Sequence, residues 1–335
     1  MENYNVAVVG ATGAVGEEML KILEERKFPV NKLKLFATEK SKGKKIEFKG
    51  QEYIVDTIKT GSFSEIDIAL FSIASSASKK IAPRAAEEGA VVIDNSNAFR
   101  MEDDVPLVVP EINPEKIFTH SGIIANPNCS TIQLVLALKP IYDQAGLEQV
   151  RISTYQAVSG TGRDAINELT HQTEAHLQQN KMKSEVYPHQ IAFNSLPHID
   201  IFFENGYTKE EMKMVREPRK ILADPEIKLS ATAVRTPVYY GHAEAVSIVT
   251  EEKLNLKTVR KLLSGMEGVE VIDDPKNNKY PLQIMSEEND SVMVGRIRED
   301  LIHERGINMW VVANNLRKGA ALNAVQIAEK LLEKE

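Results

Sequence analysis

The sequence has one cysteine and one tryptophan among its 335 residues, and only 6% of its residues are aromatic. A single cysteine excludes an internal disulfide and a zinc site built from several thiolates. Cys129 is therefore either a small buried residue or a reactive nucleophile. The histidines include no close pair with metal-ligand spacing apart from His171 and His176. Those two lie in a polar helical stretch, so we expect them to be solvated and expect no metal site.

The chain also lacks an excess of positive charge and any long apolar run. Its 41 Lys and Arg against 48 Asp and Glu give a formal net charge of -7, the wrong sign for attracting nucleic acid. No stretch approaches the roughly 20 apolar residues that a membrane helix requires, and the first residues run into a strand instead of a signal peptide. We therefore expect a cytoplasmic protein with no nucleic-acid or membrane partner.

The pattern of apolar residues predicts two domains, which is also the natural expectation for this length. Short apolar runs alternate with helical stretches in the first part, which predicts a parallel sheet covered by helices. After Cys129 the expected strands are longer and the helices less regular, which predicts a mixed sheet. The expected strands are 5–9, 33–37, 66–71, 90–93 and 122–125, then 150–158, 228–237, 243–250, 291–298 and 307–313.

Three glycines, Gly10, Gly13 and Gly16, stand between the first expected strand and the first expected helix. Glycine there lets the chain turn tightly and brings backbone amides and the helix N-terminus against a pyrophosphate. The G-x-x-G-x-x-G spacing is looser than the usual dinucleotide fingerprint, and an ordinary glycine-rich turn is the alternative. The strand and helix on either side favour a Rossmann dinucleotide-binding domain.

The end of the second expected strand bears on the choice of nicotinamide cofactor. A carboxylate there binds a ribose 2′-hydroxyl, whereas a cation binds a 2′-phosphate. Glu39 argues for NAD, and a solvated run of charge is a further alternative. The lysines favour NADP; they are Lys40, Lys42, Lys44 and Lys45.

Cys129 lies three residues before Ile132, where the apolar helical segment 132–138 begins, which puts it at the first turn of a helix. The helix dipole there favours a thiolate, and a thiolate attacks carbonyl carbons well. A nucleophilic cysteine joined to a dinucleotide-binding domain limits the chemistry to a short list.

Five motifs together resemble the aspartate-β-semialdehyde dehydrogenase family, in the same order from Val6 to about Ile327. They are GATGAVG at 10–16, PNCST at 127–131, STYQAVSG at 153–160, VRTPVYYGH at 234–242 and NNLRKGAALN at 314–323. The resemblance implies a fold similar to glyceraldehyde-3-phosphate dehydrogenase. A Rossmann domain over 1–128 would be completed by a C-terminal helix at 316–335. An α+β catalytic and dimerisation domain with a mixed sheet would span 129–315, in a homodimer or homotetramer.

The resemblance also implies an activity. Such enzymes use NADPH to reduce L-aspartyl 4-phosphate to L-aspartate 4-semialdehyde and phosphate, through a thioacyl group that would here sit on Cys129. The product feeds lysine (through diaminopimelate), threonine and methionine biosynthesis. N-acetyl-γ-glutamyl-phosphate reductase is the alternative enzyme, and glyceraldehyde-3-phosphate dehydrogenase is a weaker one. A non-catalytic nucleotide-binding protein is the alternative outside enzymes.

Three further catalytic residues are implied by the resemblance. His242 matches the general acid/base, which suits an imidazole whose pKa lies near the working pH. Gln156 matches a glutamine that orients the substrate, and Asn128 could support the same pocket. Without the resemblance, His242 would be read as a satisfied strand-end residue, and the two amides as structural caps. Asn126 departs from the many relatives that have a second cysteine there.

The substrate has an α-carboxylate, an α-ammonium and a phosphate, so its site needs cations and a carboxylate. The resemblance implies that Arg235 grips the α-carboxylate and that Arg100 binds phosphate. It also implies Glu217 for the ammonium and Lys220 for phosphate. Glu217 and Lys220 lie three apart on the helix expected at 208–223, where an exposed pair is the alternative. Pro218 between them suggests a helix start or a kink.

The glycine spacing, the second strand end and the resemblance together predict the cofactor contacts, which fall at the glycine turn, at the ends of the second and third strands, and in the second domain. They are Gly10, Thr12, Gly13, Ala14, Val15, Gly16, Thr38, Lys40, Ser41, Ser72, Ala74, Ser159, Gly160 and Asn315.

Overall fold

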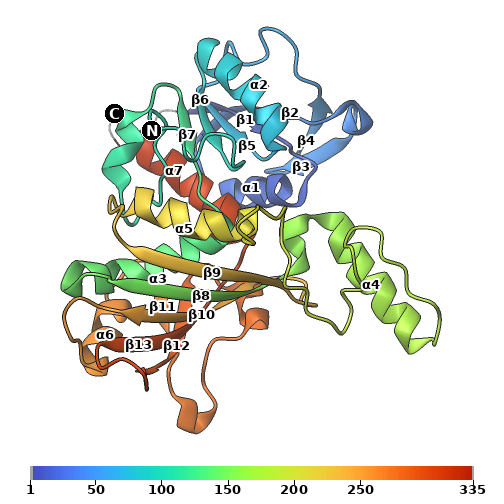
Figure 1. Cartoon of the computed structure of the whole chain (residues 1–335). Helices are drawn as coiled ribbons and strands as arrows, with labels where there is room; N and C mark the ends of the chain where they lie inside the picture. The colour runs from blue at the N-terminus through green and yellow to red at the C-terminus, as the bar shows by residue number, and fades with distance from the viewer. Residues whose placement is uncertain (1–2, 334–335) are drawn as a thin grey trace. The chain divides into compact units, whose positions relative to one another are not determined.

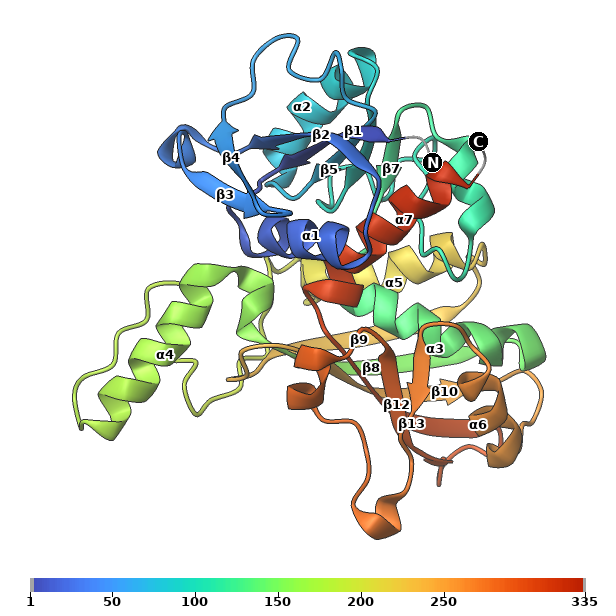
Figure 2. The same ribbon diagram turned by 180° about the vertical axis from the view of Figure 1, so that it is seen from behind.

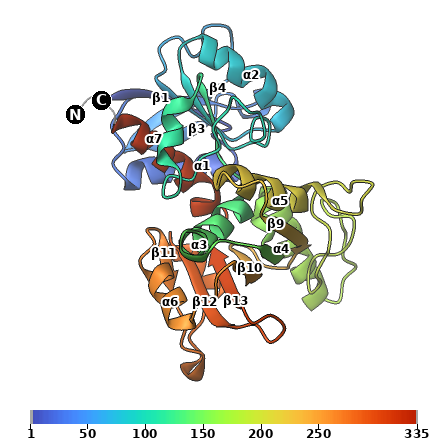
Figure 3. The same cartoon turned by 60° about the vertical axis from the view of Figure 1, so that its left-hand side comes forward.

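The computed structural model describes residues 3–333, apart from the side chain of Glu288. The described chain divides into two compact units (Figures 1, 2 and 3). One unit has the described residues up to Asn128 together with those from Ala320 onward, and the other is Cys129–Gly319.

Among the described residues, the first unit contains a seven-stranded sheet, whose strands lie in the order β3-β4-β2-β1-β5-β6-β7. Every strand pair is parallel except the β3–β4 hairpin. The strands are β1 (Tyr4–Val9), β2 (Val30–Phe36), β3 (Lys45–Phe48), β4 (Gln51–Asp56), β5 (Ile68–Phe71), β6 (Val91–Asp94) and β7 (Ile123–Ala125). The 3-10 helices are η1 (Glu39–Ser41) and η2 (Pro114–Thr119).

Helices cover both faces of this sheet, because both faces of its central strand are apolar. Val6 and Val8 of β1 pack into one core cluster, and Ala7 and Val9 pack into another. The helices are α1 (Ala14–Glu25), α2 (Ser75–Glu87) and α7 (Leu322–Leu332). Figures 1 and 2 show α1 and α7 on one face and α2 on the other. The fold is the doubly wound arrangement that the sequence predicted.

Two local features differ from the sequence-based expectation. The β3–β4 hairpin was not expected, and it takes Lys45 out of the lysine run by pairing its Nζ with the Glu52 carboxylate at 2.6 Å. The final helix, expected at 316–335, begins as a π-helix (η6, Arg317–Ala321) and continues as α7. Residues 334 and 335 lie outside the described residues.

The second unit contains a mixed sheet, in the order β11-β12-β13-β10-β8-β9. The pairs β8–β9 and β11–β12 are parallel and the others antiparallel, as the mixed-sheet prediction required. The strands are β8 (Gln149–Gln156), β9 (Lys228–Arg235), β10 (His242–Val249), β11 (Val269–Val271), β12 (Val292–Glu299) and β13 (Gly306–Ala313). The helices are α3 (Cys129–Ala145), α4 (Arg163–Leu177), α5 (Lys209–Ile221) and α6 (Leu256–Ser264). The 3-10 helices are η3 (Val158–Thr161), η4 (Pro275–Asn277) and η5 (Gln283–Glu288).

Helix α3 forms the core of this unit. It is buried along most of its length and packs against β10, β12 and β13, with α5 and α6 beside it. Helix α4 projects away from the sheet (Figures 1 and 2). Among the described helices, none is long and apolar enough to cross a membrane. Within the same residues, no group of three or more metal-ligating side chains could hold an ion.

Candidate functional site

The glycine turn of the first unit is packed so closely that side chains would not fit. Gly10 has φ +90°, and a Cβ added there would lie 2.1 Å from the Ser72 carbonyl oxygen. A Cβ at Gly16 would lie 2.2 Å from the Gly10 carbonyl oxygen. Gly13 directly precedes α1, and an added Cβ there would meet the Gly10 oxygen at a tolerable 3.3 Å. The α1 N-terminus is therefore free to face a pyrophosphate, so these residues fit a dinucleotide.

The predicted adenosine-side residues surround this turn. The Thr12 hydroxyl donates to the Ser41 hydroxyl at 3.2 Å, which ties the glycine turn to η1. Thr38 directly precedes η1, and Lys40 is exposed within it. Lys42 lies 4.0 Å from the Glu39 carboxylate. Lys45 is paired in the hairpin, and of the lysines in this run Lys40 is the one that lies within η1, next to Ser41.

The remaining first-unit cofactor candidates lie at the starts of two helices. Ala14 and Val15 are the first two residues of α1. Ser72 follows β5 and donates its backbone N–H to the Val9 oxygen at 2.8 Å. Ala74 is the residue before α2. All four therefore lie at the carboxyl ends of β1 and β5, where ligands bind in doubly wound sheets.

Arg100 lies on the loop after β6, also in the first unit. Its Nε donates to the Asn126 carbonyl oxygen at 2.8 Å, and its Nη2 to the Asn95 carbonyl oxygen at 2.7 Å. Only 7% of its surface is exposed. The guanidinium is thus held rigidly by backbone atoms, as a preformed anion contact requires.

In the second unit, Cys129 is the first residue of α3, where the sequence predicted it. It is half-buried, and its neighbour Asn128 is buried. A Cβ added at Gly319 would lie 3.0 Å from the Cys129 Cβ, so the π-helix runs directly against the cysteine. The helix N-terminus favours the thiolate form of this partly accessible sulfur.

His242 begins β10 and is completely buried. The Ala157 N–H donates to its Nδ1 at 3.1 Å, so the ring proton of the neutral form is on Nε2. Among the described residues, Nε2 has no hydrogen-bond partner. Burial, and then the nearby Arg235 cation, lower the His242 pKa from 6.5 to about 3. The expectation of a pKa near the working pH does not hold for the free protein, because the Glu210 carboxylate offsets burial and the Arg235 cation only in part.

Arg235 ends β9 and approaches His242 over Gly160. Its Nη1 donates to the Ala157 carbonyl oxygen at 2.7 Å, and its Nε has no hydrogen-bond partner in the described part of the chain. A Cβ added at Gly160 would lie 3.2 Å from Arg235 Nη1 and 3.3 Å from His242 Nε2. Glycine at 160 therefore allows a guanidinium and an imidazole to meet at one point.

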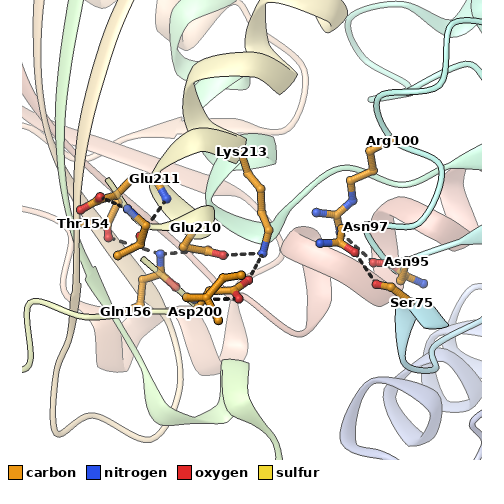
Figure 4. Close-up of polar contacts among 12 residues, drawn as sticks. Ser75, Asn95, Asn97, Arg100, Thr154, Gln156, Asp200, Glu210, Glu211 and Lys213 are labelled. Carbon is orange, nitrogen blue, oxygen red and sulfur yellow. Dashed lines mark hydrogen bonds and ion pairs between the residues drawn. The ribbon is translucent and has the colours of Figure 1, made fainter. Parts of the chain in front are cut away.

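Gln156 ends β8, and its side chain is linked to helix α5 (Figure 4). Its Nε2 donates to Glu210 at 3.2 Å and to the Thr154 hydroxyl at 3.3 Å. Lys213 in turn contacts the Glu210 carboxylate at 2.8 Å and that of Asp200 at 3.2 Å. A buried carboxylate and a cation thus lie directly beside the predicted substrate glutamine.

The residues predicted to bind the ammonium and the phosphate, Glu217 and Lys220, lie elsewhere on α5. Helix α5 continues through Pro218, so that proline marks no start. Glu217 and Lys220 come seven residues after Glu210 and Lys213, which is about 10 Å along the helix. The spacing Glu-x-x-Lys occurs twice on α5, and the prediction from the sequence was the second copy. Only the neighbourhood of Gln156 distinguishes the first.

The second-unit cofactor candidates are joined to one another. Ser159 and Asn315 exchange side-chain hydrogen bonds of 3.0 and 3.2 Å. The Asn315 carbonyl also accepts from the Gly241 N–H at 2.9 Å, directly before His242. Ser159 and Gly160 lie in η3, and Asn315 follows β13. These residues therefore line the same region as the imidazole.

Comparison with known proteins places both units in related families. Residues 5–120 match the family model "Semialdehyde dehydrogenase, NAD binding domain", and residues 138–318 match "Semialdehyde dehydrogenase, dimerisation domain". The chain is 59% identical over 334 residues to the aspartate-semialdehyde dehydrogenase of Aquifex aeolicus, covering 98% of both chains. It is 49% identical to that of Bacillus subtilis, covering 98% of this chain and 97% of the relative.

Solved structures show the same likeness. The structure of aspartate semialdehyde dehydrogenase II from Vibrio cholerae complexed with ASA has a TM-score of 0.97 and 50% identity over 99% of each chain. The Candida albicans enzyme, solved with NADP, has a TM-score of 0.77 and 26% identity, again over 99% of each chain.

Proposed function

Because this chain belongs to the aspartate-semialdehyde dehydrogenase family, we propose that it reduces L-aspartyl 4-phosphate with NADPH to L-aspartate 4-semialdehyde and phosphate. We place this reaction in lysine, threonine and methionine biosynthesis. The observation that carries the proposal is the meeting of Arg235 and His242 at Gly160. A carboxylate-binding cation and an acid/base group converge there, as a charged acyl substrate requires.

Cys129 is the nucleophile in this proposal. Its thiolate forms a carbon–sulfur bond with the acyl carbon, and the carbon–oxygen bond to phosphate breaks. The N-terminus of α3 stabilises the thiolate before attack. Arg100, fixed by two backbone carbonyls, binds the departing phosphate dianion.

Reduction of the thioester uses a hydride, which the bound nicotinamide supplies. The imidazolium form of His242 gives its Nε2 proton to the oxyanion that hydride addition leaves on the thioester carbon, and the neutral imidazole takes the proton back when the carbon–sulfur bond breaks and Cys129 leaves as the thiolate. In the free protein Arg235 helps to keep the imidazole neutral. A substrate carboxylate on Arg235 offsets that cation, so substrate binding raises the His242 pKa toward the working range.

The contacts of Gln156 indicate which residues bind the charged groups of the substrate. We assign the α-ammonium to Glu210 and a phosphate contact to Lys213, in place of Glu217 and Lys220. A free ammonium needs such a buried counter-charge, whereas the N-acetyl group of the alternative substrate does not. Gln156 orients the acyl group, and buried Asn128 supports the loop before the cysteine.

For the cofactor we propose NADP. The exposed Lys40 beside the glycine turn supports this choice, as does the NADP in the Candida albicans relative. The matched family model is described only as NAD binding. Comparing kcat/KM for NADPH and NADH measures the preference, and equal values would contradict it.

We further propose a homodimer formed through the second unit, whose sheet matches a dimerisation domain. Along β8, alternate side chains are buried beneath the helices, and Tyr155 on the opposite face is 36% exposed. Its ring lies 5.3 Å from that of Trp310. Large rings on an otherwise polar face are typical of interfaces. Light scattering would distinguish monomer, dimer and tetramer.

The main test of the proposal is phosphate-dependent reduction of NADP with aspartate semialdehyde, repeated with N-acetylglutamate semialdehyde. We expect turnover only with the first substrate. Cys129→Ala should abolish turnover and leave cofactor binding unchanged. Substantial residual activity in that variant would refute covalent catalysis.

A further inference from the structure

Three asparagines in the first unit form a hydrogen-bonded series that ends at Arg100. Asn95 follows β6, Asn126 follows β7, and Asn323 is the second residue of α7. Asn126 and Asn323 are completely buried. Buried amides are costly unless they are hydrogen-bonded, so their partners define what they hold in place.

Hydrogen bonds link the three side chains one after another. Asn323 Nδ2 donates to the Asn126 Oδ1 at 2.7 Å and to the Val108 carbonyl oxygen at 3.0 Å. Asn126 Nδ2 donates to the Asn95 Oδ1 at 2.6 Å (both Asn95 and Arg100 are labelled in Figure 4). Asn126 must therefore accept and donate at once, which an amide can do and an aliphatic side chain cannot.

The two backbone oxygens that accept hydrogen bonds from Arg100 belong to Asn126 and Asn95, whose side chains are bonded to each other. Arg100 Nε is bound by the Asn126 carbonyl and Nη2 by the Asn95 carbonyl. The side-chain bond between Asn95 and Asn126 fixes the separation of these carbonyls. Asn323 fixes Asn126 to the C-terminal helix.

We propose that Asn126 and Asn323 are positioning residues that orient the Arg100 guanidinium for phosphate, so that α7 takes part in phosphate binding. The inference rests on the proposed function, because it takes phosphate as the ligand of Arg100. Neither asparagine touches the substrate. They act by holding the two carbonyls between which the guanidinium lies.

The test uses Asn323→Leu in the full chain, assayed by phosphate-dependent oxidation of aspartate semialdehyde. We expect the KM for phosphate to rise about tenfold, as for a lost buried hydrogen bond, while the KM for the aldehyde changes less than twofold. Asn323→Ser, which keeps one donor, should give a smaller rise and decides the matter if the leucine variant does not fold. Gln326→Leu is the matched control, since it removes another α7 hydrogen bond, to Glu111, and should leave both values unchanged.

A second experiment distinguishes a positioning role from a general loss of structure. In an Arg100→Ala background, Asn323→Leu should raise the phosphate KM no further, because its effect passes through Arg100. Equal rises in both KM values, or an undiminished effect in that background, would overturn the inference and leave the proposed function standing. Absence of phosphate-dependent activity in the unmodified protein would overturn both.

Discussion

Replacing His242 by asparagine should remove the acid/base group without disturbing the fold. The Ala157 N–H donates to Nδ1 of the imidazole at 3.1 Å. The carbonyl oxygen of an asparagine side chain stands at nearly the same distance from the backbone as Nδ1 and can accept the same bond. Only the Nε2 side of the ring, which faces Gly160, is lost.

The expected loss of kcat is about 100- to 10,000-fold, the range for a positioned proton donor and acceptor. In the proposed mechanism the departing phosphate takes its proton from solvent and not from His242. A stopped-flow experiment with the acyl phosphate and NADPH should therefore still show a burst of one phosphate per subunit, followed by slow oxidation of NADPH.

His242→Leu is the matched control, because it leaves the Ala157 N–H buried and unpaired. It should lose about 1–3 kcal/mol of unfolding free energy relative to His242→Asn, with a similar kcat. A kcat for His242→Asn within threefold of the unmodified protein would refute the assignment. Loss of the phosphate burst would instead mean that His242 acts earlier, in activating the thiol.

Three more predictions follow from single contacts. Glu210→Gln should raise the KM for aspartate semialdehyde at least tenfold, and Glu217→Gln should not, as steady-state kinetics would reveal. Gly319→Ala should slow alkylation of Cys129 by iodoacetamide, because the new methyl group would sit 3.0 Å from the cysteine Cβ; an unchanged rate would contradict that packing. Burial raises the Glu244 pKa well above 4.5, so its contribution to stability is greatest below pH 4.5 and is lost as pH rises. Urea unfolding of Glu244→Gln should show a stability gain over the parent that grows by about 1.4 kcal/mol per pH unit above pH 5.

Much of the fold could be predicted from residue patterns, because helices and buried strands leave strong periodic signals. The order of β1, α1, β2, β5, α2, β6 and β7 follows from apolar runs separated by helical stretches. The β3–β4 hairpin could not be predicted in this way, because its strands are short and largely exposed. A π-helix has no distinct sequence pattern, so the start of the C-terminal helix was also missed.

The candidate site shows a sharper limit. Motif resemblance was enough to predict roles for Cys129 and His242, but the choice between two Glu-x-x-Lys copies on α5 depends on which one reaches β8. The side-chain bond between Gln156 and Glu210 joins residues 54 positions apart, and no local pattern encodes such a distance. The low pKa of His242 likewise depends on burial and on Arg235, both of which come from tertiary packing.

Strand β10 carries two buried ionisable groups whose effects on stability oppose each other. Neutral His242 stabilises the fold fully above pH 6.5, and this contribution is lost as pH falls toward 3. Protonated Glu244 stabilises the fold fully below pH 4.5, and its contribution is lost as pH rises. Between pH 4.5 and pH 6.5, stability rises with pH through His242 and falls with pH through Glu244, so the two effects oppose each other. The two groups lie two residues apart on one strand and face the same buried side of the sheet, so the burial that lowers the His242 pKa in the free protein also raises the Glu244 pKa.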